Sequence, residues 1–189
     1  AALVHDEPCD IIVCGGNTDM VPPYKRTEAG AMHQWFDDYL LRPTNAKVAH
    51  LVRIIEDNQS YSTLENLLNT DQLISDKTSP VVVFCEYTRI YRVSALAKEI
   101  FKERLQEVIA IDFETSPQRY VDPKIILEKE QKALKHDVWA MKNADNMLEH
   151  SKLYRDKIDF IRAHPNDPDI IKKWWESVLI KEWDKIENS

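Results

Sequence analysis

Residues 9–18 read CDIIVCGGNT, and the fold expected for the chain follows from this stretch. The run CDIIVC is short and almost continuously apolar, which favours a strand buried on both faces over a helix. Two adjacent glycines follow, although the whole chain of 189 residues has only three, where average usage of about 7% would give roughly thirteen. At the carboxyl end of a parallel strand, glycine permits a positive φ and lets a ligand approach the main chain.

Three further apolar runs have the character of buried strands, and helical patterns separate them. Strands that alternate with helices of about ten to sixteen residues are typical of parallel βαβ units. We therefore expect an α/β fold with a doubly wound, mainly parallel sheet of about four to five strands. The further strands are expected at 52–55, 81–85 and 108–112, and the helices at about 27–41, 62–75 and 89–105.

Two of these helices begin with capping signals. Ser62 and Glu65 have the Ser-x-x-Glu spacing of a capping box, in which the hydroxyl and the carboxylate each satisfy a backbone N–H group. Thr27 precedes Glu28 and is a suitable N-cap, with an acid in the first turn.

After Pro123 the pattern becomes helical. A leucine or methionine recurs every seven residues at 127, 134, 141 and 148, which predicts one amphipathic helix from about 123 to 149. The segment HPNDPD at 164–169 breaks the chain. A last helix then carries Trp174, Trp175 and Trp183 on a broad apolar face.

The change from alternating strand and helix patterns to helical patterns alone predicts two domains. We expect an α/β domain at 1–122 and a helical C-terminal extension at 123–189 that packs on it or on a partner subunit. The tryptophan-bearing helices would then be the surface of a homo-oligomer.

Composition excludes several classes of partner. The net charge of −7 and the pI of about 5.4 oppose nucleic acid and anionic membrane surfaces. No apolar run approaches the roughly eighteen residues of a membrane span, so we expect no membrane segment. The six histidines show neither HExxH nor paired spacing, and we expect no metal site.

The cysteines indicate the compartment. Cys9, Cys14 and Cys85 lie in or beside strand-like runs, and their odd number without CxxC spacing argues against a disulfide framework. We expect reduced thiols and a cytoplasmic protein. A removed leader stays open as an alternative, because the sequence starts without Met and close to its first strand.

The first candidate site is the Gly15-Gly16 turn with Asn17 and Thr18. These residues would give main-chain and polar contacts to a ligand. The turn is neither a GxGxxG motif nor a P-loop, so a tight turn without a ligand is the alternative.

The second candidate site lies between a strand end and a helix start. Ser60, Thr63, Glu65 and Asn66 follow Glu56-Asp57 and place hydroxyls, an amide and carboxylates at the carboxyl edge of the sheet. For Ser62 and Glu65, helix capping is an equally good explanation. Asn66 lies one residue beyond the capping box, so capping does not explain it.

The third candidate site is the turn after the strand at 81–85. Thr88 is followed by Arg89 and Arg92, three residues apart at the start of a helix. Cations at a helix N-terminus oppose the macrodipole unless they meet an anion. The alternative to a ligand is salt bridges to Glu28, Glu56 or Glu65.

In this order the motifs resemble the ElyC/SanA/YdcF family, a domain family of unknown function. The matching segments are Cys14-Gly15-Gly16, Glu28-Ala29, Asp57 to Asn66, and Glu86 to Arg92, within residues 9 to 112. The family pattern has an additional strand with its own glycine turn before the first motif. This chain begins after that strand or lacks it, and either Glu56 or Asp57 is the motif acid.

The resemblance implies a Rossmann-like fold and adds Glu28 to the binding residues. It also makes S-adenosylmethionine the named candidate ligand, because at least one bacterial member of the family looks able to bind it. Other members are linked to cell-envelope integrity without a settled reaction, and a shared fold does not fix a chemistry.

Three hypotheses on function follow. The leading one is a protein that binds a small, nucleotide-like molecule, with Arg89 and Arg92 neutralising an anionic group. The second is a hydrolase or transferase with Glu65 or Asp57 as general base, although no nucleophile motif is present. The third is an interaction protein with a degenerate pocket.

Overall fold

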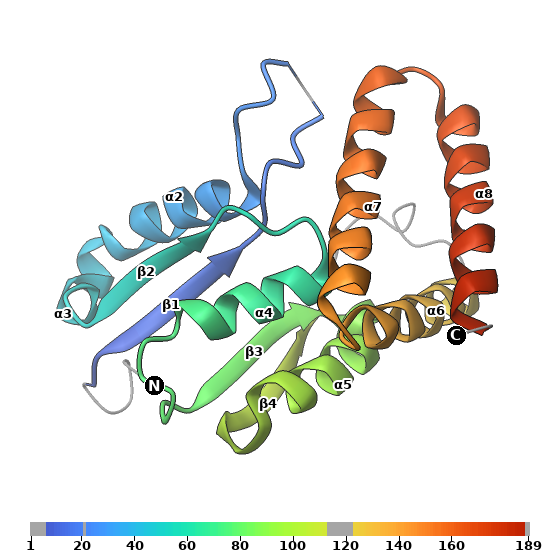
Figure 1. The fold of residues 1–189 in the computed structure, drawn as a ribbon. Helices are drawn as coiled ribbons and strands as arrows, with labels where there is room; N and C mark the ends of the chain where they lie inside the picture. Colours follow the sequence, from blue (N-terminus) through green and yellow to red (C-terminus); the bar gives the residue numbers. More distant parts are fainter. Residues whose placement is uncertain (1–6, 21, 113–122, 188–189) are drawn as a thin grey trace. The chain divides into compact units, whose positions relative to one another are not determined.

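The computed structural model describes residues 7–20, 22–112 and 123–187. The chain is a mixed α/β protein that divides into two compact units, Ala1–Thr70 and Asp71–Ser189, called unit 1 and unit 2 below (Figure 1). The domain boundary predicted at 122/123 stays a prediction, and it adjoins residues 113–122, which lie outside the described residues.

Unit 1 contains the first βαβ unit. Its two strands, β1 and β2, pair in parallel from Cys9↔Val52 to Cys14↔Asp57, and α2 packs against both (Figure 1). The β-branched run that follows Cys9 suits this pleated, half-covered surface. The elements are β1 (Cys9–Cys14), α2 (Glu28–Leu40), η1 (Pro43–Asn45), α3 (Ala46–Ala49), β2 (Val52–Asp57) and the first part of α4 (Thr63–Leu73).

Both predicted capping signals are confirmed. The Thr27 hydroxyl accepts a hydrogen bond from Gly30 N at 3.0 Å at the start of α2. The Ser62 hydroxyl accepts one from Glu65 N at 3.1 Å, and α4 begins at Thr63. Buried Leu64 and Leu67 lie on the inner face of α4.

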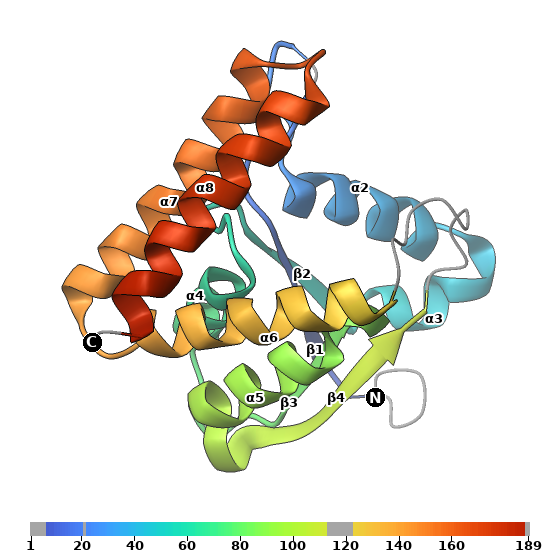
Figure 2. The same ribbon diagram turned by 90° about the vertical axis from the view of Figure 1, so that its right-hand side faces the viewer.

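Unit 2 begins with a second βαβ unit. Here β3 and β4 pair in parallel with one irregularity between Val81 and Val82, and α5 packs on both strands (Figure 2). Val93, Leu96 and Phe101 of α5 are buried. The elements are β3 (Val81–Glu86), η2 (Tyr87–Arg89), α5 (Ile90–Phe101), η3 (Lys102–Arg104) and β4 (Leu105–Ile111).

All four predicted strands are therefore present, in two parallel sheets of two strands each. The mixed α/β class and the parallel pairing are confirmed. The single doubly wound sheet of four to five strands stays a prediction.

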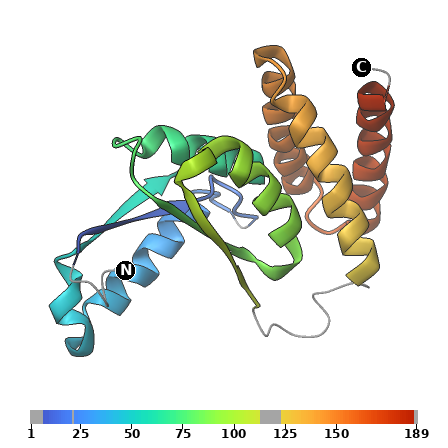
Figure 3. The same ribbon diagram turned by 90° about the horizontal axis from the view of Figure 1, so that it is seen from below.

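The prediction of one helix over 123–149 is wrong. The structure has two helices there, α6 (Pro123–Ala140) and α7 (Ala144–Ala163), followed by α8 (Pro168–Glu187). The break occurs because Asn143 caps α7, accepting a hydrogen bond from Asn146 N at 2.9 Å. The three helices pack pairwise and form one group in Figure 3, where α6 crosses between α7 and α8 in the view.

Candidate functional site

The Gly15-Gly16 turn connects β1 to the start of α2. Gly15 has φ +138°, and a Cβ there would lie 2.6 Å from the Cβ of Glu28. A Cβ on Gly16 would lie 2.7 Å from the carbonyl oxygen of Ser60. Each glycine is therefore required by the close approach of another segment of unit 1 and, for Gly15, by its backbone conformation.

The main-chain groups of this turn are used within the protein. Gly15 N donates to Asp57 O at 3.0 Å, and Gly16 N donates to Ser60 O at 2.6 Å. Their carbonyls accept from Ala29 N and Glu28 N at the start of α2. The two glycine N–H groups are thus already bonded, so they do not form an anion-binding nest.

A buried polar network holds the loop after β2. The Asp57 carboxylate accepts hydrogen bonds from the Ser60 hydroxyl, from Gln59 N at 3.0 Å and from Asn69 Nδ2 at 3.2 Å. Asn69 Nδ2 also lies 3.0 Å from the Ser60 hydroxyl oxygen. Of the two acids left open by the sequence, it is Asp57 that contacts Ser60, and both residues are buried.

Glu65, a predicted general base, has a structural contact. Its carboxylate accepts a hydrogen bond from Tyr61 N at 2.6 Å, and the residue is buried. Asp57 likewise holds the loop through its hydrogen bonds. These contacts are those of helix capping and loop positioning, and the role of either acid as a base stays a prediction.

Thr63 and Asn66 lie differently. They share one face of α4 with Thr70, because the three residues are spaced by three and four. Thr70 Oγ1 lies 3.1 Å from Cys14 Sγ, so this face adjoins the carboxyl end of β1. Among the described residues, the side chains of Thr63 and Asn66 make no hydrogen bond, and both are half-buried.

Glu28 and Thr18 lie beside the same turn. The Thr18 hydroxyl donates to Glu28 Oε1 at 2.5 Å. A Cβ on Gly15 would lie 2.7 Å from Glu28 Oε2, so this carboxylate is directly over the turn. Asn17 faces the loop after the turn, and its side-chain amide donates to the carbonyl of Tyr24.

Glu56 belongs to another polar group. It accepts hydrogen bonds from Asn58 Nδ2 at 2.7 Å and contacts His33 Nδ1 at 2.5 Å. The hydrogen bond from Asn58 and then that from His33 lower the pKa of Glu56 below its usual value. The pair joins α2 to the end of β2.

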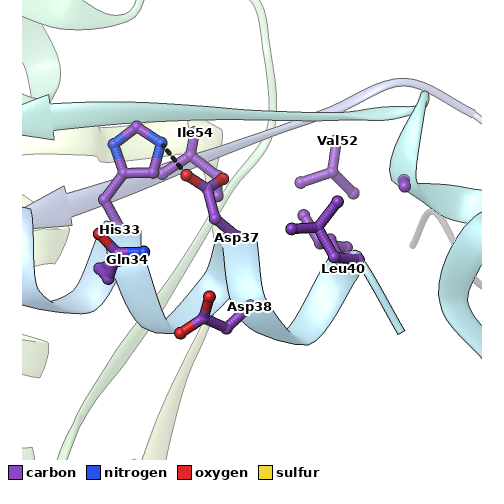
Figure 4. A pocket seen from close by; sticks show the side chains of 9 residues that line it. His33, Gln34, Asp37, Asp38, Leu40, Val52 and Ile54 are labelled. Carbon is purple, nitrogen blue, oxygen red and sulfur yellow. Dashed lines mark ion pairs between the residues drawn. The ribbon is translucent and has the colours of Figure 1, made fainter.

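A pocket of about 500 Å³ lies in unit 1 between α2 and the first half of β2 (Figure 4). His33 and Asp37 face each other along its wall, with Nε2 and Oδ2 3.6 Å apart. None of the residues predicted from the sequence lines it. The lining residues are His33, Gln34, Asp37, Asp38, Leu40, Leu41, Ala49, Val52 and Ile54.

The third candidate group lies in unit 2. Thr88 and Arg89 belong to η2, and Arg89 is exposed with Nε 3.6 Å from Glu86 Oε2. Arg92 is buried and contacts both oxygens of Asp137, at 2.6 Å from Nε and 3.0 Å from Nη2. Its Nη1 lies 3.7 Å from Glu130 Oε2. The partners of Arg92 are thus acids of α6 and not the three acids considered from the sequence. These partners balance the positive charge of Arg92, so no anionic ligand is needed there.

Two histidines that the sequence analysis set aside lie beside this ion pair. His136 of α6 and His150 of α7 are buried, with their Nδ1 atoms 3.0 Å apart. Burial, and then the neighbouring His136 and Arg92, lower the pKa of His150 to about 3. Burial also raises the pKa of Asp137 to about 6, against the effect of the Arg92 guanidinium.

The spacing of these histidines around Asn143 is the signal that could have found them. Each lies seven residues from Asn143, which caps α7, and residues equidistant from such a turn lie side by side in a helix hairpin. On the single helix predicted over this segment, residues fourteen apart would be separated by about 21 Å. Because a single helix was predicted here, the contact between His136 and His150 was not expected.

The C-terminal aromatic residues form a packed stack. Trp174 stacks on Phe160 with ring centroids 4.4 Å apart, and Lys157 Nζ lies 4.3 Å from the Trp175 centroid. Both tryptophans are half-buried. The side chain of Trp183 lies outside the described residues, and the homo-oligomer stays a prediction.

The three cysteines are free thiols in the structure. Within the described part of the chain, none of the helices is long and apolar enough to cross a membrane. Comparisons of the sequence and structure with known protein families, curated proteins and solved structures gave no match.

Proposed function

We propose that unit 1 binds a small molecule at the carboxyl ends of β1 and β2. The observation that carries this proposal is that the polar side chains of Thr63 and Asn66 are not used in hydrogen bonds among the described residues. By contrast, the buried Asp57 carboxylate accepts hydrogen bonds from Gln59 N and Asn69 Nδ2. A hydroxyl and an amide held on a rigid helix face at the carboxyl end of a strand are suited to orienting a ligand.

The charges at the turn define the class of ligand. The Gly15 and Gly16 N–H groups are already bonded, and the Glu28 carboxylate lies over the turn. A phosphate here would face a carboxylate and would find both glycine N–H groups already bonded, whereas a cation or a hydroxyl group would find an acceptor. The ligand is therefore a nucleoside-like molecule with hydroxyl or amino groups and a positive charge.

S-adenosylmethionine fits this class, since it combines ribose hydroxyls with a sulfonium and an ammonium group. The resemblance to the ElyC/SanA/YdcF family supports the same ligand. The proposal includes a Rossmann-like, doubly wound sheet of four to five strands, for which the two βαβ units are the support. It includes a cytoplasmic location, for which the free cysteines are the support.

Calorimetric titration of the full chain tests the proposal. We expect heat of binding with S-adenosylmethionine and none with ATP, because ATP brings negative charge to Glu28. Asn66→Ala should weaken binding about tenfold, the effect of losing one or two hydrogen bonds. Glu28→Gln should weaken binding of S-adenosylmethionine more than that of neutral adenosine.

Gln34→Ala is the matched control, because Gln34 is an exposed amide in unit 1 that lines the α2–β2 pocket. This variant should leave the affinity unchanged. Absence of binding with S-adenosylmethionine, its demethylated product, ATP and NAD would refute the nucleotide proposal. A loss of affinity in Gln34→Ala alone would place the ligand in the α2–β2 pocket and contradict the proposed location.

A further inference from the structure

Three potential metal ligands meet inside unit 2. His136, Asp137 and His150 each offer one ligand atom, and these atoms all lie within 4.8 Å of one another. The two histidine Nδ1 atoms are 3.0 Å apart, and His150 Nδ1 lies 3.9 Å from Asp137 Oδ1. In a tetrahedral zinc site with Zn–N bonds of 2.0–2.1 Å, ligand nitrogens are separated by about 3.3 Å. The two nitrogens are close to this separation, whereas the Asp137 carboxylate would have to move closer to the histidines to complete the set.

The helix hairpin brings these ligands together. His136 and Asp137 lie on α6 and His150 on α7, and α6 packs on α7. Asn143 caps α7, and Asn146 Nδ2 donates to Trp139 O at 2.8 Å across the turn. The hairpin is thus fixed at the turn two helical turns from the histidines, which holds them on facing helix surfaces.

Surrounding groups orient the ligands, as they do in metal sites. The Arg92 guanidinium holds both Asp137 oxygens at 2.6 and 3.0 Å, so the carboxylate plane is fixed. Arg92 adds a positive charge beside the ligands, and Glu130, whose Oε2 lies 3.7 Å from Arg92 Nη1, offsets it. The His150 ring also packs on that of Tyr154, with centroids 4.7 Å apart.

We infer that His136, Asp137 and His150 bind a divalent transition-metal ion, with zinc as the matching metal, and that this ion joins α6 to α7. Two imidazoles and one carboxylate are ligands typical of zinc, cobalt and related ions rather than of magnesium. The three residues are fully or almost fully buried. Three protein ligands leave the fourth position of a tetrahedral zinc ion to a water molecule.

A hydrogen bond between the two imidazoles is the competing explanation for the close approach of their Nδ1 atoms. It predicts a different position for the protons on the ring nitrogens. In a hydrogen-bonded pair, one ring carries a proton on Nδ1 and donates it to the Nδ1 of the other. When both Nδ1 atoms bind a metal, both rings carry their proton on Nε2. The protonation of the rings therefore distinguishes the two states.

Titration of the full chain with Co²⁺ is the first test. Co²⁺ in a site of this kind absorbs visible light, so binding can be followed directly. We expect one equivalent to bind, Zn²⁺ to displace it, and Mg²⁺ to leave it in place. His150→Gln should abolish this binding, whereas His50→Gln, at an exposed histidine of unit 1, should keep it. An unchanged spectrum on adding Co²⁺, or equal binding by His150→Gln, would overturn the inference.

Because His150 is fully buried, His150→Gln can fail to fold. In that case the ¹⁵N NMR spectrum of the histidine rings of the wild-type protein, recorded in the presence of Zn²⁺, tests the inference. We expect both buried rings to carry the proton on Nε2, with their Nδ1 signals shifted by Zn²⁺. A buried ring that keeps an Nδ1 proton at saturating Zn²⁺ would contradict the inference.

Discussion

The Ser60 hydroxyl donates a hydrogen bond to the Asp57 carboxylate, and both residues are buried, with 1% and 3% of their surfaces exposed. The same Asp57 ends β2, and Asn69 of α4 reaches both side chains. This contact therefore ties the strand, the loop and the helix of unit 1 together. The position of Asn66 near the carboxyl end of β1 depends on it.

Asp57→Asn should lower the free energy of unfolding by about 1–3 kcal/mol, because an NH₂ group would meet the donors that the carboxylate now accepts from. Asp38→Asn, at an exposed position of α2, should change it by less than about 0.5 kcal/mol. Urea unfolding of the two variants measures the difference. Equal stabilities would show that the Asp57 network does not hold the loop.

Gly15→Ala and Gly16→Ala should each destabilise the protein by more than about 1 kcal/mol. For Gly15 the causes are φ +138° and the contact with Glu28, and for Gly16 the cause is the Ser60 carbonyl 2.7 Å from the new Cβ. Thermal unfolding of the variants checks this. If both alanines are tolerated without a fall in melting temperature, the glycines are not required by packing.

Arg92→Met should lower the free energy of unfolding by about 3–5 kcal/mol, because it leaves the Asp137 carboxylate buried without its cation. Arg89→Met is the matched control, because Arg89 is exposed and its ion pair with Glu86 is worth about 1 kcal/mol or less. Denaturant unfolding compares the two. A smaller loss for Arg92→Met than for Arg89→Met would contradict the burial of the ion pair.

The pH dependence of stability should include Glu56. Its pKa is lowered in the folded state from the ordinary value of 4.5, so its stabilising effect is present above that pH and is lost as the pH falls through the lowered pKa. Glu56→Gln should therefore be less stable than the wild type at pH 6, and this difference should shrink at lower pH. A difference that stays constant from pH 6 to the acid range would exclude a lowered pKa.

The elements of the fold were predictable where their signals are local. The apolar runs gave all four strands, and Thr27 and Ser62 gave two helix starts. The helix expected to reach residue 105 ends at Phe101, because Lys102 has φ +51° and β4 begins at Leu105. The repeat around Met141 concealed the turn before α7, since hydrophobic spacing continues across it.

The candidate site was predictable in part. The sequence placed the glycine turn and the loop after β2 at one edge, and Gly16 N does bond to Ser60 O. Asn69 was missed because it lies one turn beyond the motif. The partners of Arg92 depend on contacts of α6 with α5, which no local pattern reveals. The His136–His150 pair was missed because the turn at Asn143 was not recognised.

Mapping the ligand on the protein by NMR tests the proposed function most directly. On addition of S-adenosylmethionine, we predict that the side-chain NH₂ signals of Asn66 and the backbone signals of Gly15 and Gly16 shift together with one affinity. The signals of Gln34 should stay in place. Shifts confined to the residues of the α2–β2 pocket, or no shift at a ligand concentration in large excess, would contradict a binding site at the carboxyl ends of β1 and β2.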